Sequence, residues 1–173
     1  MTIRKDGGAA SLDARVEAGD WADALGDPVA LATQCHAAAA DIDPMAAGGF
    51  DLLFTDDARL AELNAAHRGR EGPTNVLSFP SGAQDTGFLG DVALAYETCA
   101  REAARDGKSI TAHAAHLIVH GLLHLIGYDH ETDDEATVME RLETSILARL
   151  GVDDPYAGDK AGAAFSSKGE SLK

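Results

Sequence analysis

A long apolar segment, Ile110–Ile126, dominates the second half of the 173-residue chain. Ser109 precedes it as a helix N-cap residue, and Gly127 follows it at a position suited to a left-handed C-cap. The sequence therefore predicts one helix between these two residues. Histidines and a glycine interrupt the apolar run well before the roughly 20 residues that a membrane span needs. We expect a long central helix inside a globular domain, and no helix that crosses a membrane.

Shorter segments with strand or helix periodicity surround this helix. Strands are predicted at residues 12–18, 50–54, 75–79 and 89–94, and further helices at residues 28–41, 57–68, 96–106 and 133–150. Strands prevail in the first half of the chain and helices in the second. This distribution predicts an α+β fold in which helices pack on a small mixed sheet. The order of the strands does not follow from these patterns.

The length of the chain suits one domain. We expect that domain at residues 11–151, with flexible tails at residues 1–10 and 158–173, because both ends are rich in small residues and lack apolar periodicity. No apolar secretion signal follows the first basic residues, which predicts a cytoplasmic protein. The two cysteines, Cys35 and Cys99, are expected to be buried thiols.

Composition limits the ways in which the chain can bind a polyanion. Aromatic residues make up 5 % of the chain, too few for a platform on which bases stack. The formal net charge is −15, which disfavours tight binding to nucleic acid through charge alone. The charge is uneven, however, because residues 59–127 carry 6 basic and 7 acidic side chains. A local positive patch can form in this nearly neutral third of the chain.

The apolar segment carries histidines at the spacing of metal ligands. Four residues advance about 400° around a helix, so His120 and His124 lie about 40° apart on one face. Gly127 can turn the chain sharply at positive φ and bring His130 back toward that face. Three neutral imidazoles with an open fourth position form the ligand set of a catalytic zinc site. The pattern, which is also the ligand spacing of metzincin peptidases, predicts one Zn²⁺ per chain at these three histidines.

A competing pair of histidines lies one helical turn earlier. His116 and His120 also have the i, i+4 spacing that lets two imidazoles share an ion. We favour the pair His120 and His124, because Gly127 and His130 are placed to complete a triad with it. His116 is then expected to be a core residue or one that supports a ligand.

The residue after the first histidine distinguishes this chain from zinc peptidases. Those enzymes place a glutamate there as the general base, and this chain has Gly121. Asp129 is the nearest candidate carboxylate. Three alternatives stay open for Asp129: it transfers a proton, it orients a ligating imidazole, or it is simply exposed to solvent.

Two further blocks accompany the histidine motif. Residues 63–80 read Leu-Asn-Ala-Ala-His-Arg-Gly-Arg-Glu-Gly-Pro-Thr-Asn-Val-Leu-Ser-Phe-Pro, and residues 89–92 read Leu-Gly-Asp-Val. With the histidine motif of residues 120–130, they resemble in order and spacing the YbeY family of metal-dependent endoribonucleases. The resemblance covers about residues 12–150. The chain departs from the family pattern at His67, Arg70 and Glu71, where Tyr, Lys and Asp are usual.

The resemblance implies a zinc site at the three motif histidines and a functionally required arginine at Arg68. A planar guanidinium suits phosphodiester cleavage, because it can hold two charged oxygens with parallel hydrogen bonds. The plainer interpretation of Arg68 is an exposed arginine near a helix C-terminus. Ser78 either lines the same cleft or merely ends a strand. We predict catalytic roles for Arg68 and His120, and substrate contacts from Arg68 and Ser78.

Three functional hypotheses follow. The first is a zinc-dependent endoribonuclease selective for single strands, which the resemblance places in 16S rRNA 3′-end maturation and ribosome quality control. The second is a zincin-like metallopeptidase, and the third is a non-catalytic, metal-stabilised ribosome-assembly factor. The acidic net charge suggests that a partner delivers the RNA. The small ribosomal subunit is the expected setting, with a ribosomal protein or an assembly GTPase as partner.

Overall fold

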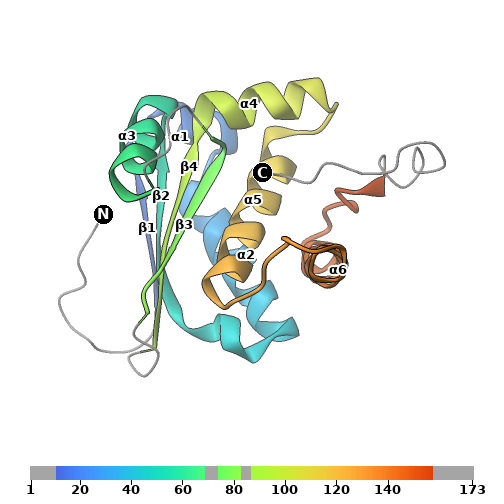
Figure 1. The fold of residues 1–173 in the computed structure, drawn as a ribbon. Helices are drawn as coiled ribbons and strands as arrows, with labels where there is room; N and C mark the ends of the chain where they lie inside the picture. The colour runs from blue at the N-terminus through green and yellow to red at the C-terminus, as the bar shows by residue number, and fades with distance from the viewer. Residues whose placement is uncertain (1–10, 69–73, 83–86, 158–173) are drawn as a thin grey trace.

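The computed structural model describes residues 11–68, 74–82 and 87–157, so the expected tails at 1–10 and 158–173 lie outside the described residues. A four-stranded sheet runs through the molecule (Figure 1). Its strands, in spatial order, are β1 (Leu12–Val16), β2 (Gly49–Thr55), β4 (Phe88–Ala95) and β3 (Val76–Pro80). The first three are parallel, and β3 pairs with β4 in the antiparallel direction. The sheet is therefore mixed, as predicted.

Helices flank this sheet on both faces. They are α1 (Asp20–Leu25), α2 (Pro28–Ile42), α3 (Asp57–Arg68), α4 (Tyr96–Arg105), α5 (Ile110–Leu125) and α6 (Asp133–Arg149), with the short 3-10 helix η1 (Pro44–Ala47). The predicted α+β fold is confirmed, and the predicted elements end within about two residues of the observed ones. The elements α1 and η1 were not predicted, because six and four residues are too few to show helical periodicity.

The capping residues explain where the main helices begin. The side chains of Asp27 and Ser109 each accept a hydrogen bond from a backbone N–H of the first turn. Thr132 and Glu135 form the reciprocal capping box of α6. Gly127 has φ 106°, a conformation that glycine adopts without strain, and it turns the chain out of α5. These local signals fix the ends of the helix that carries the histidines.

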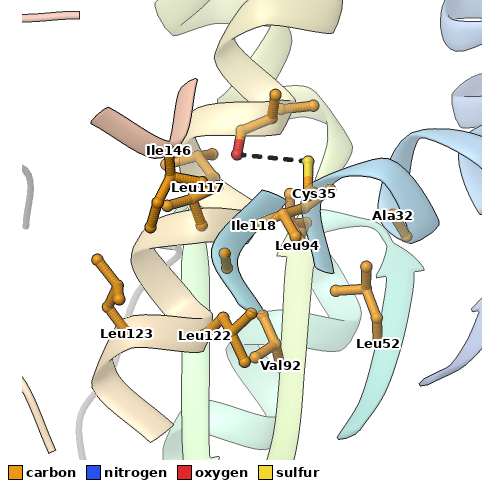
Figure 2. Close-up of a cluster of buried hydrophobic side chains, with 14 of the residues drawn as sticks. Ala32, Cys35, Leu52, Val92, Leu94, Leu117, Ile118, Leu122, Leu123 and Ile146 are labelled. Atoms are coloured by element: carbon orange, nitrogen blue, oxygen red, sulfur yellow. Dashed lines mark hydrogen bonds between the residues drawn. The ribbon is translucent and has the colours of Figure 1, made fainter. Parts of the chain in front are cut away.

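The helix α5 is the centre of the core. Figure 1 shows α2 and α5 on one side of the sheet, α3 on the other and α6 beyond α5. Figure 2 shows the buried side chains where α5 meets β4, β2, α2 and α6: Leu117, Ile118, Leu122, Leu123, Val92, Leu94, Leu52, Ala32, Cys35 and Ile146. A smaller apolar cluster lies between the sheet and α3. Helix α5 is therefore held rigidly on several sides.

Both cysteines are buried free thiols, as expected. The Cys35 thiol lies 4.0 Å from the carbonyl oxygen of Ala115 on α5 (Figure 2). Burial raises the pKa of both thiols to about 12, so they are unreactive packing groups. Among the described residues, no helix has the length and apolar character required to span a membrane.

Candidate metal centre

The three predicted ligands come together at the C-terminal end of α5. His120 and His124 lie on one face of the helix, with their Nε2 atoms 3.2 Å apart. The turn at Gly127 brings His130 against both rings, at centroid distances of 5.3 Å and 5.0 Å. One nitrogen from each ring lies within 4.8 Å of the other two, so the group could hold a metal ion. The competing residue His116 lies farther from His120, with ring centroids 6.3 Å apart.

Hydrogen bonds on the far side of two rings fix which nitrogens face one another. His120 Nδ1 lies 2.5 Å from Glu143 Oε2, and His124 Nδ1 lies 2.9 Å from the carbonyl oxygen of Tyr128. Carboxylate and carbonyl oxygens only accept, so both Nδ1 atoms carry the proton. Both Nε2 atoms therefore turn lone pairs toward one another, an arrangement that suits the binding of one shared cation. Their 3.2 Å separation is close to the roughly 3.3 Å expected between two ligands of a tetrahedral zinc ion.

The protonation of His124 also suits metal binding. Its pKa is lowered to about 4, first by burial and then by the neighbouring His120 and His130, against the smaller opposite effects of Asp129 and the Tyr128 carbonyl. His124 is therefore neutral at pH 7. A neutral imidazole with a free Nε2 is the form that coordinates metals.

Glu143 on α6 is a buried carboxylate that was not predicted. It is fully buried and receives hydrogen bonds from His120, from His116 at 3.2 Å and from the hydroxyl of Tyr156. Burial alone would raise its pKa, but the hydrogen bonds from His116 and His120 lower it to about 2. It is therefore an ionised carboxylate at neutral pH. One signal could have revealed it: Glu143 occupies the apolar face of α6, between Met139 and Ile146.

His116 belongs to this second layer of contacts. Its residue exposure is 3 %, and its Nε2 lies 3.2 Å from Glu143 Oε1 and 3.3 Å from the hydroxyl of Tyr156. Burial lowers its pKa, so it is neutral. Tyr156 lies after α6, so the packed chain continues to this residue. His116 is therefore a core residue that contacts the partner of a predicted ligand, as expected from the sequence.

Asp129 has a defined backbone contact. Its Oδ1 accepts a hydrogen bond of 2.8 Å from the backbone N–H of His130. This bond holds the loop that presents the third histidine. Its charge also raises the pKa of His124, so the carboxylate lies near the three histidines.

Gly121 and Ser78 explain how closely α5 approaches the sheet. A Cβ at Gly121 would lie 2.8 Å from Val92 Cγ1 and 3.2 Å from Ser78 Oγ. The Ser78 hydroxyl donates to the Gly121 carbonyl at 3.1 Å, and the residue is 7 % exposed. Ser78 thus ties β3 to α5. The substrate contact predicted for it stays a prediction.

Arg68 is the last residue of α3, and its side chain lies outside the described part of the structure. The side chain of His67 and residues 69–73, which include Arg70 and Glu71, also lie outside it. The role predicted for Arg68 therefore stays a prediction.

The fold and the site together define a class: α+β proteins in which two histidines of a buried helix and a third from the segment after it form a group that could hold a metal ion. The chain belongs to the YbeY family. A family profile described as "Endoribonuclease YbeY" matches residues 22–151. The resemblance inferred from the sequence motifs is confirmed.

Curated relatives agree with this assignment. Three proteins named "Endoribonuclease YbeY" are similar to the chain. The one from Jannaschia sp. (strain CCS1) is 58 % identical over 61 % of this chain and 74 % of its own length. The one from Rhodopseudomonas palustris is 49 % identical over 83 % and 79 %, and the one from Chelativorans sp. (strain BNC1) is 48 % identical over 86 % and 94 %.

A solved structure supports the fold. The solution structure of a protein from Thermotoga maritima matches with a TM-score of 0.54 at 18 % identity. The match covers 92 % of this chain and 99 % of that protein. At this identity the likeness shows the shared fold alone.

Proposed function

We propose that this protein is a metal-dependent endoribonuclease that cleaves single-stranded RNA with one Zn²⁺ per chain. The observation that carries the proposal is the meeting of His120, His124 and His130, whose nitrogens lie within 4.8 Å of one another. Three imidazoles without a thiolate suit a catalytic zinc ion, which keeps a position for substrate or water. Relatives named as endoribonucleases support RNA as the substrate class.

A zinc ion bound there would supply a Lewis acid for phosphodiester hydrolysis. The chain's own residues have distinct tasks. The three histidines hold the ion, and Glu143 and the Tyr128 carbonyl orient two of the rings. We assign Arg68 to bind the phosphate and stabilise the charge that develops on its oxygens.

The packing around Gly121 disfavours a zincin-like peptidase. The glutamate that such enzymes use as general base would stand at this residue. Val92 and Ser78 occupy the space into which its side chain would have to grow. The described site therefore has no room for the peptidase base at its usual place.

The acidic charge of the chain supports assisted delivery of the RNA. A protein with net charge −15 attracts free RNA weakly, so a partner that already holds the RNA favours the encounter. We propose 16S rRNA as the substrate, in 3′-end maturation and ribosome quality control in the cytoplasm. The partner would be a ribosomal protein of the small subunit or an assembly GTPase.

Metal removal tests the proposed activity. A chelator is expected to abolish cleavage of a single-stranded RNA, and one equivalent of Zn²⁺ is expected to restore it. The measurement is gel-resolved cleavage beside zinc content, with a duplex of the same sequence as the control for strand selectivity. Cleavage that persists in metal-free protein would contradict the proposal and favour a non-catalytic assembly factor.

Replacing Arg68 with glutamate separates RNA chemistry from metal binding. The Arg68→Glu protein is expected to retain its zinc, while cleavage falls at least about 100-fold, because a transition-state charge loses its donor. Arg59→Glu on the same helix is the matched control. Arg59 pairs with Glu62 at 3.2 Å on the surface, and its replacement is expected to leave cleavage unchanged. Full activity of Arg68→Glu would remove the arginine from the mechanism.

A further inference from the structure

Helix α5 carries three histidines that meet a carboxylate from another helix, and two of them, His120 and His113, make the shorter contacts. His120 meets Glu143 of α6 at 2.5 Å, and His113 meets Glu102 of α4 at 2.8 Å. Both imidazoles are buried, with 6 % and 4 % of the side chains exposed. Only the first pair includes a residue of the metal centre. Both pairs join an imidazole to a carboxylate. They differ because the other ring nitrogen of His120 faces His124 of the candidate metal centre.

The Glu143 contact determines which nitrogen His120 presents to the centre. A neutral imidazole carries its one proton on either Nδ1 or Nε2. A carboxylate against Nδ1 holds the proton there and leaves the Nε2 lone pair toward His124. Without that acceptor, the ring could carry the proton on Nε2, where it would block coordination. The contact therefore sets both the tautomer and the angle of the ring.

The carboxylate itself is held in place from its other side. His116 and the Tyr156 hydroxyl both contact Oε1, while Oε2 contacts His120. The two carboxylate oxygens of Glu143 thus have different hydrogen-bond partners, and the side chain is fully buried. Helix α6 and the segment after it fix the carboxylate relative to α5.

We propose that Glu143 is a positioning residue for the metal ligand His120, which it holds in the Nδ1-protonated form. This proposal rests on the metal centre of the proposed function, and it does not depend on the substrate being RNA. Carboxylates that orient a ligating histidine typically change metal affinity 10- to 100-fold when they are replaced. Glu143 acts through His120, because it contacts Nδ1 while Nε2 of the same ring faces His124.

The test compares two amide substitutions in the full-length protein. Glu143→Gln removes the charge beside the metal ligand, and Glu102→Gln makes the same change beside His113. Zinc affinity is measured by competition with a chromophoric chelator, and the ligand field is read from the visible spectrum of the Co²⁺ form. The free energy of unfolding of both metal-free variants is measured by urea denaturation.

Glu143→Gln is expected to bind zinc 10- to 100-fold more weakly, with a changed Co²⁺ spectrum. Glu102→Gln is expected to bind within about twofold of the unaltered protein, although it also loses stability. Equal weakening in both variants would mean a general effect of stability and would overturn the proposal. Unchanged affinity in Glu143→Gln would overturn it as well.

A second measurement needs no variant and covers the case in which Glu143→Gln does not fold. Long-range ¹H–¹⁵N NMR spectra of the metal-free protein report the tautomer of His120. The Nδ1-protonated form is expected, and the Nε2-protonated form would overturn the proposal. Zinc binding with these results but without RNA cleavage would refute the proposed endoribonuclease and leave the role of Glu143 standing.

Discussion

Replacing His124 with alanine is expected to weaken zinc binding more than 100-fold and to abolish RNA cleavage. The reason is the loss of one of three donors that converge within 4.8 Å. Sharing the 10–16 kcal/mol of a four-ligand zinc site about equally gives about 3 kcal/mol per ligand, which corresponds to more than 100-fold. Elemental analysis of the purified protein, with a cleavage assay on the same preparation, measures both effects.

The fold should survive this substitution. His124 is only partly buried, and its contacts, from Nδ1 to the Tyr128 carbonyl and from Nε2 to His120, are both local to the end of α5. The circular dichroism spectra of metal-free His124→Ala and of the metal-free unaltered protein are therefore expected to be the same. His36→Ala is the control, because His36 bonds to the carbonyl of Gly48 away from the centre and its loss should leave zinc content unchanged. Stoichiometric zinc in His124→Ala would refute the assigned ligand set.

Introducing the peptidase glutamate at Gly121 is expected to destabilise the protein by at least about 4 kcal/mol. A Cβ alone would sit 2.8 Å from Val92 Cγ1, and overpacking of this kind costs about 1–3 kcal/mol. A carboxylate buried between α5 and the sheet adds the cost of an unpaired charge. Because domains of this kind are stable by only about 5–15 kcal/mol, a large fraction of Gly121→Glu should be unfolded or aggregated.

Urea denaturation measures the loss in the free energy of unfolding, and two further variants serve as controls. Gly121→Ala should lose about 1–3 kcal/mol, since it adds the colliding Cβ without the charge. Gly19→Glu should change stability by less than about 0.5 kcal/mol, because nothing lies within 4 Å of its Cβ position. A folded Gly121→Glu protein that cleaves peptides would contradict both the packing argument and the rejection of the peptidase hypothesis.

The parts of the site that could be predicted depend on residues close together in the sequence. His120, His124 and Gly127 belong to one helix and its cap, so helical geometry alone places them. The caps at Ser109 and Thr132 are equally local, and they located the ends of α5 and α6. Local rules of this kind fixed the helices well.

The rest depends on contacts between distant segments. Glu143 lies 23 residues after His120, and a single glutamate in an amphipathic helix is usually exposed to solvent. Ser78 lies 43 residues before Gly121, so only the docking of α5 on β3 reveals where its hydroxyl points. The order of the strands, with β4 between β2 and β3, likewise has no local signal. Tertiary packing decides each of these features.

The tie between Tyr156 and Glu143 also bears on the order in which the centre is completed during translation. The ribosome makes the chain from its N-terminus, so α5 with His120 and His124 emerges before α6. The carboxylate at Glu143 follows, and the hydroxyl of Tyr156 that contacts it comes later still. A nascent chain therefore possesses all three imidazole donors, His130 included, before the two groups that hold His120 in place. The candidate metal centre thus gains the contacts that orient His120 only after nearly all of the described chain has been made.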